Sequence, residues 1–185
     1  MLRTVSALAA ATATLAAAGL VQASTLVIGG LAGACSSLAR QGRHGPDDLD
    51  ICTRAISLQS LNLHDLAGTY VNRGSMELGA RMYDEADSDF RQAMQIMPAM
   101  GEAHIGEGAY FDSEGRFPEA EREISRGLAM GSEEPEKGYY FRAIARWGQD
   151  DFKGAYDDFQ HAVMLKPTWA LPREELKNFH VEEAR

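Results

Sequence analysis

Hydrophobic residues recur three or four positions apart, with polar residues between them, over most of the stretch from 67 to 169. This spacing is typical of amphipathic α-helices. Helix ends are marked as well: Gly115 can end one helix in a left-handed conformation, and Pro118 suits the first position of the next. Two further helices should stop at Pro98 and Pro167, because proline cannot continue the hydrogen-bond ladder. The pattern predicts an all-α chain built of helix pairs.

The helix pairs repeat along the chain. A shift of 69 residues places Asp89-Phe90 on Asp158-Phe159, and a shift of 34 places Glu85-Ala86 on Glu119-Ala120. Three copies follow, over residues 67–100, 101–135 and 136–169. Small residues fall where the two helices of a copy would touch, and a large side chain there would push the helices apart. These small residues are Gly74, Gly108, Ala143, Ala86, Ala120 and Ala155.

The first and third copies have an early aromatic residue, a small residue four positions later, an alanine near the turn, a large apolar residue, a second alanine and a closing proline. This 34-residue pattern resembles the tetratricopeptide repeat. The second copy departs from it, with His104 at the aromatic position and Gly127 at an alanine position, but keeps the helical period. The resemblance implies an α-solenoid of three helix–turn–helix repeats that binds proteins in a concave groove.

The flanking segments are expected to cover the two ends of this array, because a solenoid unit buries its faces only against neighbours. Residues 24–66 are predicted to form an N-terminal helical hairpin, with helices near 31–41 and 47–58. Residues 170–185 are predicted to form a C-terminal capping helix, which would pack on the third repeat through apolar side chains. Those side chains are Leu171, Leu176 and Phe179.

Residues 1–23 have the pattern of a secretory signal peptide. Arg3 precedes a run of Ala, Leu and Val, and the run ends in small residues before a cleavage point after Ala23. We therefore expect an exported protein, in the periplasm of a Gram-negative bacterium, without stable membrane insertion after cleavage. One alternative is an uncleaved membrane anchor. A second, less favoured alternative is a lipid anchor on Cys35, which a partial match to a lipoprotein cleavage box suggests.

The only two cysteines, Cys35 and Cys52, fall on neighbouring helices of the predicted hairpin. Thiols in an exported protein tend to oxidise, so a disulfide between them is expected. Such a bond would contribute roughly 3 kcal/mol to the free energy of unfolding. The alternative is a pair of buried free cysteines.

Charge and motif content exclude several function classes. Lys and Arg total 18 against 27 Asp and Glu, and a net charge of −9 argues against nucleic-acid binding. The chain lacks the common catalytic motifs, so we expect no enzyme activity, no cofactor and no metal. His104 and Glu107 share one helix face and could hold a metal, but no second histidine lies nearby in the pattern. A core-packing role for His104 is therefore favoured.

The family resemblance implies that the first helix of each repeat lines the groove. The implied groove residues are Asn72, Ser75, Ile105, Ala109, Asp112, Lys137, Tyr140, Phe141, Ile144 and Trp147. Tyr140, Ile144 and Trp147 could instead be covered by the C-terminal helix. Only Lys137 matches the positions with which some members of the family bind a C-terminal carboxylate, so no such clamp is expected. The acids Glu102 and Asp112 favour a neutral or basic partner segment.

These observations predict a scaffold or adaptor of the bacterial cell envelope that binds a protein or peptide. The alternative is a structural protein that associates with copies of itself.

Overall fold

The computed structural model describes residues 30–179, and within this range the chain forms nine helices and no strand. The predicted signal segment 1–23 and residues 180–185 lie outside the described residues. The helices are α1 (Gly30–Arg40), α2 (Pro46–Leu58), α3 (Leu63–Gly79), α4 (Tyr83–Ile96), α5 (Gly101–Ser113), α6 (Phe117–Met130), α7 (Pro135–Trp147), α8 (Phe152–Leu165) and α9 (Ala170–Leu176). Among residues 30–179, no helix has the length and apolar composition needed to cross a bilayer.

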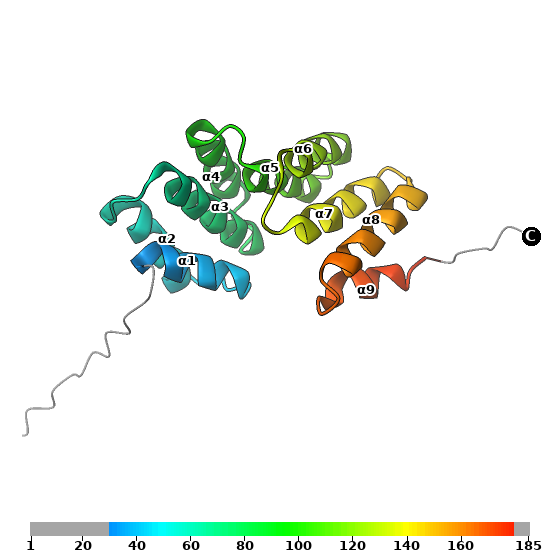
Figure 1. Cartoon of the computed structure of the whole chain (residues 1–185), viewed down its shortest axis with the longest axis horizontal. Helices are drawn as coiled ribbons and strands as arrows, with labels where there is room; N and C mark the ends of the chain where they lie inside the picture. Colours follow the sequence, from blue (N-terminus) through cyan, green and yellow to red (C-terminus); the bar gives the residue numbers. More distant parts are fainter. Residues whose placement is uncertain (1–29, 180–185) are drawn as a thin grey trace, which may run out of the picture.

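The helices form a curved array with an inner and an outer row (Figure 1). The inner helices α1, α3, α5 and α7 contact one another in that order, and each outer helix contacts the inner helix of the next pair. The predicted α-solenoid is confirmed, with α3–α4, α5–α6 and α7–α8 as its three repeated pairs. The hairpin α1–α2 contacts α3 as any preceding pair would, so it takes the place of a fourth pair. Helix α9 closes the other end by packing on α8.

Helix ends follow local backbone chemistry. Gly115 has the predicted left-handed conformation, with φ of 70°, and Pro118 is the second residue of α6 rather than the first. The equivalent turns of the other pairs use left-handed Arg81 and Asp150, which the sequence pattern did not indicate. Helix α3 begins at Leu63, before the expected start of the first copy at residue 67, because the Asn62 side chain caps it by accepting from the Asp65 N–H.

Each repeated pair is closed by a small residue on the inner helix and a large apolar residue on the outer helix. A Cβ on Gly74 would lie 3.0 Å from Phe90 Cε1, and a Cβ on Gly108 would overlap Ile124. In the third pair Ala143 packs with Phe159 in the same way. Phe90, Ile124 and Phe159 are fully buried. The predicted small positions are therefore the helix-crossing points, where close approach lets these side chains fill the core.

The C-terminal cap packs through a different face from the one predicted. Leu176 and Phe179 pack against the cluster around Phe159, as expected, but Leu171 is 51% exposed and that part of the prediction is wrong. Pro172 is buried instead. The reason is the helical period of α9: residues 172 and 176 are spaced by four and share one face, whereas residue 171 points about 100° away. Phe179 follows the end of α9 at Leu176.

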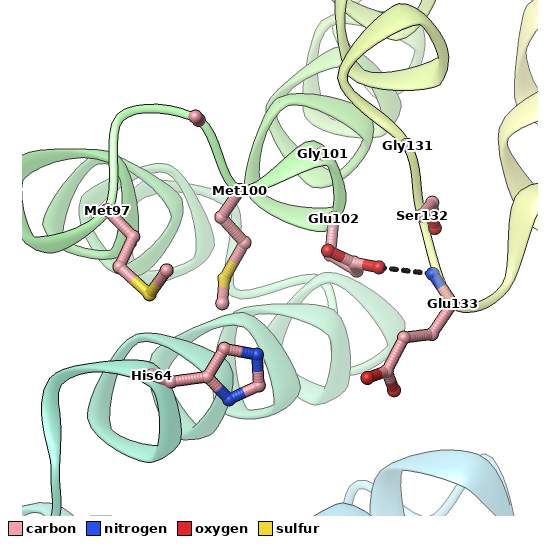
Figure 2. A pocket seen from close by; sticks show the side chains of 9 residues that line it. His64, Met97, Met100, Gly101, Glu102, Gly131, Ser132 and Glu133 are labelled. Carbon is pink, nitrogen blue, oxygen red and sulfur yellow. Dashed lines mark hydrogen bonds between the residues drawn. The ribbon is translucent and has the colours of Figure 1, made fainter.

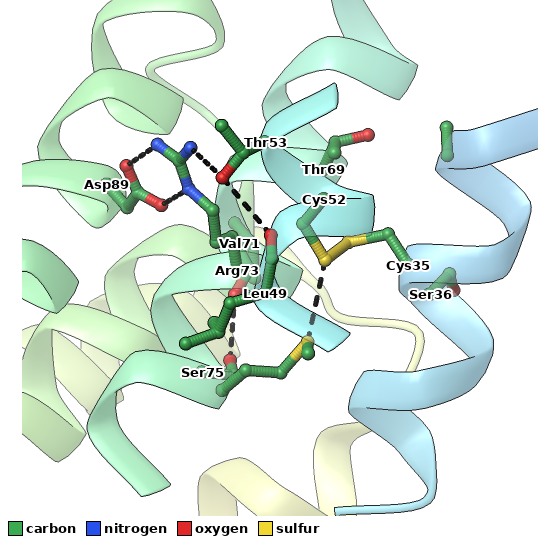
Figure 3. Close-up of a disulfide and its surroundings, with 12 residues drawn as sticks. Cys35, Ser36, Leu49, Cys52, Thr53, Thr69, Val71, Arg73, Ser75 and Asp89 are labelled. Atoms are coloured by element: carbon green, nitrogen blue, oxygen red, sulfur yellow. Dashed lines mark hydrogen bonds and ion pairs between the residues drawn. A yellow bond between two sulfur atoms is a disulfide. The ribbon is translucent and has the colours of Figure 1, made fainter. Parts of the chain in front are cut away.

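The N-terminal hairpin contains the expected disulfide (Figure 3). Cys35 of α1 and Cys52 of α2 are both fully buried, and their Cα atoms are 4.9 Å apart. The Met76 sulfur of α3 lies 3.5 Å from the Cys52 sulfur. The bond therefore joins α1 to α2 at the point where both meet the first repeated pair.

Candidate functional site

A groove with a volume of about 480 Å³ runs along the inner row of helices. Its walls come from α1, α3, α5 and the start of α7, together with the linker that precedes α7. The predicted groove residues that line it are Asn72, Ser75, Ile105, Ala109, Lys137 and Phe141. These residues come from all three repeats, so the groove is a single surface to which every repeated pair contributes.

The sequence pattern missed two parts of this wall. Helix α1 contributes Ser36, Ala39 and Arg40, and the linker contributes residues 132–134. The spacing of Cys52 and Ala55 does echo that of Phe90 and Ala93, which could have marked α1–α2 as an additional pair with α1 in the inner row. The linker residues carry no comparable signal, because loops have no hydrophobic period.

Three predicted groove residues belong to the core of the third pair. Tyr140, Ile144 and Trp147 pack against the cluster that Leu176 and Phe179 cover. The Tyr140 and Trp169 ring centroids are 5.0 Å apart, and so are those of Trp147 and Phe179. The structure therefore places Tyr140 and Trp147 against the C-terminal segment, the alternative arrangement that the sequence left open for them.

Asp112 also lies outside the groove lining. Both of its carboxylate oxygens are buried, and neither has a hydrogen-bond partner among the described residues. Burial away from water raises the pKa of Asp112 to about 8. The carboxyl group is therefore neutral near pH 7, and it does not present a negative charge to a ligand there.

Among the other charged side chains of the groove, one ion pair and one hydrogen bond to the backbone stand out. The Lys137 ammonium donates to Glu134 Oε2 at 2.6 Å, and Glu102 Oε1 accepts from the Glu133 backbone N–H at 2.6 Å. Figure 2 shows this end of the groove, where Glu102 and Glu133 lie near His64 and Met100. A smaller hollow of about 290 Å³ continues from it toward Met97. The surface combines apolar side chains with acidic groups at one rim.

The histidine and glutamate that the sequence pattern placed on one helix face gain a third neighbour in the structure. His104 and Glu107 of α5 lie beside Glu123 of α6, and their ligand atoms are all within 4.8 Å of one another. None of the three lines the groove. Glu123 was missed because it lies on a different helix from the other two.

Comparison with known proteins gives matches by structure but not by sequence. No protein-family model and no curated protein matches the chain.

The structural matches cover most of each solved domain. The TPR domain of Arabidopsis OM64 has a TM-score of 0.56 at 20% identity, over 63% of this chain and 96% of that one. The first TPR of Spaghetti (RPAP3), solved with the HSP90 peptide SRMEEVD, has a TM-score of 0.55 at 20% identity, over 60% and 90%. MamA from Desulfovibrio magneticus RS-1 has a TM-score of 0.54 at 17% identity, over 77% of each chain. Residues 30–179 therefore have the tetratricopeptide-repeat fold.

Proposed function

We propose that this protein is a non-enzymatic interaction module that binds a segment of a partner protein in the groove along α1, α3, α5 and α7. The observation that carries the proposal is the continuous groove of about 480 Å³, to which all three repeated pairs contribute side chains. Peptide docking commonly uses such concave surfaces between helices. The Spaghetti (RPAP3) domain, which holds an HSP90 peptide on the same fold, supports this mode of binding.

The groove favours a neutral or basic segment over a free C-terminal carboxylate. A carboxylate needs several converging donors. Here Lys137 is engaged by Glu134, and Glu102 and Glu133 add negative charge to the same rim. The net charge of −9 would also speed the approach of a basic partner.

The proposed location is the bacterial cell envelope, where the protein would act as a scaffold or adaptor in the periplasm. The signal-like segment 1–23 supports export. The Cys35–Cys52 disulfide is consistent with an oxidising compartment. Because this bond uses the Cys35 sulfur atom, it also favours a free protein over one with a lipid on that residue.

The test is site-specific photo-crosslinking in intact cells. The crosslinker is placed at Asn72 or at Ser75, both of which line the groove, and at Gln92 as a control on the exposed outer side of α4. We expect one discrete foreign protein to be captured from both groove positions and not from Gln92. Equal capture from all three positions would contradict groove binding.

Self-association is a second candidate, and the exposed apolar side chains near the C-terminal end favour it. Met164 is 66% exposed, and Leu165 and Leu171 are each 51% exposed. These side chains could bury themselves against a second copy. A molar mass that rises with protein concentration, and that returns to the monomer value in a Met164→Glu/Leu165→Glu variant, would support this function over the adaptor.

A further inference from the structure

The first and third repeated pairs share one polar arrangement between their inner and outer helices. In the first pair Arg73 donates two hydrogen bonds to Asp89, at 2.7 and 2.8 Å, and its guanidinium lies over the Tyr70 ring. In the third pair Arg142 donates to Asp158 twice, at 2.8 Å each, and lies over the Tyr139 ring. Three residues of the first pair therefore have equivalents in the third pair: Tyr70 and Tyr139, Arg73 and Arg142, and Asp89 and Asp158. In both pairs a buried acid on the outer helix is neutralised by an arginine of the inner helix.

The second pair has different chemistry at the same three positions. The 34-residue register places His104 at the tyrosine position, Glu107 at the arginine position and Glu123 at the aspartate position. A carboxylate therefore replaces the cation, and two acids face each other between α5 and α6. The three ligand atoms still converge to within 4.8 Å.

In its neutral form, His104 would have no proton to donate to Glu123. Its Nε2 lies 3.1 Å from the Pro98 carbonyl oxygen, which can only accept, so Nε2 must carry the proton. The neutral ring then has a lone pair on Nδ1, and Nδ1 lies 3.2 Å from Glu123 Oε2, which is also an acceptor. His104 is 3% exposed, so water cannot readily mediate this contact. The contact needs either an additional proton or a cation.

The arginines around the cluster compensate its charge weakly. Arg91 of α4 approaches Glu107 at 3.7 Å and also serves Asp87, while Arg122 and Arg126 of α6 approach Glu123 at 3.3 and 4.0 Å. All three arginine side chains are more than half exposed, and exposed ion pairs contribute little. Burial, and then the negative charge of Glu123, raise the pKa of Glu107. The cluster therefore lacks the largely buried arginine that the other two pairs have.

We propose that His104 Nδ1 and the carboxylates of Glu107 and Glu123 bind one divalent transition-metal ion, with Zn²⁺ as the best match. Imidazole and carboxylate are ordinary Zn²⁺ ligands, whereas Mg²⁺ and Ca²⁺ prefer all-oxygen sites. The hydrogen bond from Nε2 to the Pro98 carbonyl is the kind of support that fixes the tautomer of a metal-bound histidine. The ion would join α5 to α6, as arginine joins the helices of the other pairs. The site is separate from the groove and independent of the proposed partner binding.

The test is isothermal titration of the untagged, metal-free full chain with ZnCl₂ at pH 7, in excess Mg²⁺ to occupy weak carboxylate sites. We expect one Zn²⁺ per chain and a melting temperature that rises with Zn²⁺ concentration. Glu107→Arg recreates the arginine–acid pair of the other repeats, so it should fold while its Zn²⁺ association constant falls at least about tenfold. Glu123→Gln, which keeps the side-chain shape, should lose affinity to a similar degree.

The matched control is His161→Gln, because His161 is an exposed histidine outside the cluster. This variant should bind Zn²⁺ like the parent chain. The proposal is overturned if the parent binds no Zn²⁺, or if His161→Gln loses as much affinity as the cluster variants. It is also overturned if ¹⁵N resonances show that His104 Nδ1 keeps a proton in excess Zn²⁺, since an imidazolium would then supply the missing positive charge.

Discussion

The N-terminal pair α1–α2 and the first repeated pair α3–α4 close the same helix crossing by different means. In α3–α4 the small Gly74 faces the large Phe90, and the contact is purely apolar. In α1–α2 the corresponding contact is the Cys35–Cys52 disulfide. A covalent bond thus occupies the position where the repeats rely on packing.

The number of neighbours explains this difference. Helix α5, in the middle of the array, packs against α3, α4, α6 and α7, whereas α1 packs against α2 and α3. Helix α1 buries Cys35 and Leu38, and its other side chains stay at least partly exposed. A terminal pair gains less from stacking, and a disulfide offsets part of this loss by restricting the unfolded chain. The interior pairs should therefore depend on packing, and the N-terminal pair on its redox state.

The largest expected effect is the loss of the apolar crossing. Phe90→Ala should lower the free energy of unfolding by about 3–5 kcal/mol, because it leaves a cavity under Gly74 and Gly106. Urea unfolding monitored by circular dichroism measures this change. Gln92→Ala, on the exposed side of the same helix, should cost less than about 0.5 kcal/mol. Similar costs for both variants would contradict the assigned packing.

Removal of the disulfide should have the next largest effect. The Cys35→Ser/Cys52→Ser variant should lose about 3 kcal/mol, the loop-entropy value for a closure of this length. Reduction of the parent chain should cause a similar loss, and reduction of the variant should change nothing. Hydrogen exchange should locate the loss in α1 and α2, with the amides of α7 and α8 unaffected. Equal loss of protection along the whole array would mean that the ends do not differ as proposed.

Overpacking of a repeated crossing should cost less than removing its core side chain. Ala86 is fully buried between α3 and α4, and Ala86→Phe should lower stability by about 1–3 kcal/mol. Gln92→Phe adds a ring of the same size at an exposed position and should be nearly neutral. The difference between their denaturant midpoints is the measurement, and equal midpoints would show that the helix register is wrong.

The helices and repeats could be predicted because the hydrophobic period and the small crossing residues are local signals. The groove could be predicted only in part. Tyr140 and Trp147 look like binding residues within their own helix, but a segment more than twenty residues away covers them. Arg40 lines the groove only because α1 joins the inner row, which depends on packing between helices. Glu123 lies on a different helix from His104, so the residue spacing along one helix face does not reveal their contact.

The smallest expected effect is a dependence of stability on pH. The repeated pairs carry buried acids that the disulfide does not influence, so pH separates the stability of the repeats from that of the N-terminal pair. The pKa of Asp112 is raised from 3.8 to about 8 by burial, so the folded state holds this proton more tightly than the unfolded state. Its stabilising contribution is present at low pH and is lost as the pH rises from about 4 to about 8. Burial also raises the pKa of Glu77 to about 7, so its stabilising contribution is likewise lost as the pH rises.

Asp112→Asn should therefore reduce the decline in stability between pH 5 and pH 9. At pH 9 we expect the variant to be more stable than the parent by about 1 kcal/mol, the lower range for an unsatisfied buried polar group. At pH 5 the parent carboxyl is protonated, so the two proteins should differ less. Urea unfolding at both pH values, repeated in the Cys35→Ser/Cys52→Ser background, is the measurement. The same pH effect in both backgrounds would show that the N-terminal pair and the middle of the array are stabilised independently. A benefit of equal size at pH 5 and pH 9 would instead mean that the Asp112 carboxyl does not titrate in this range.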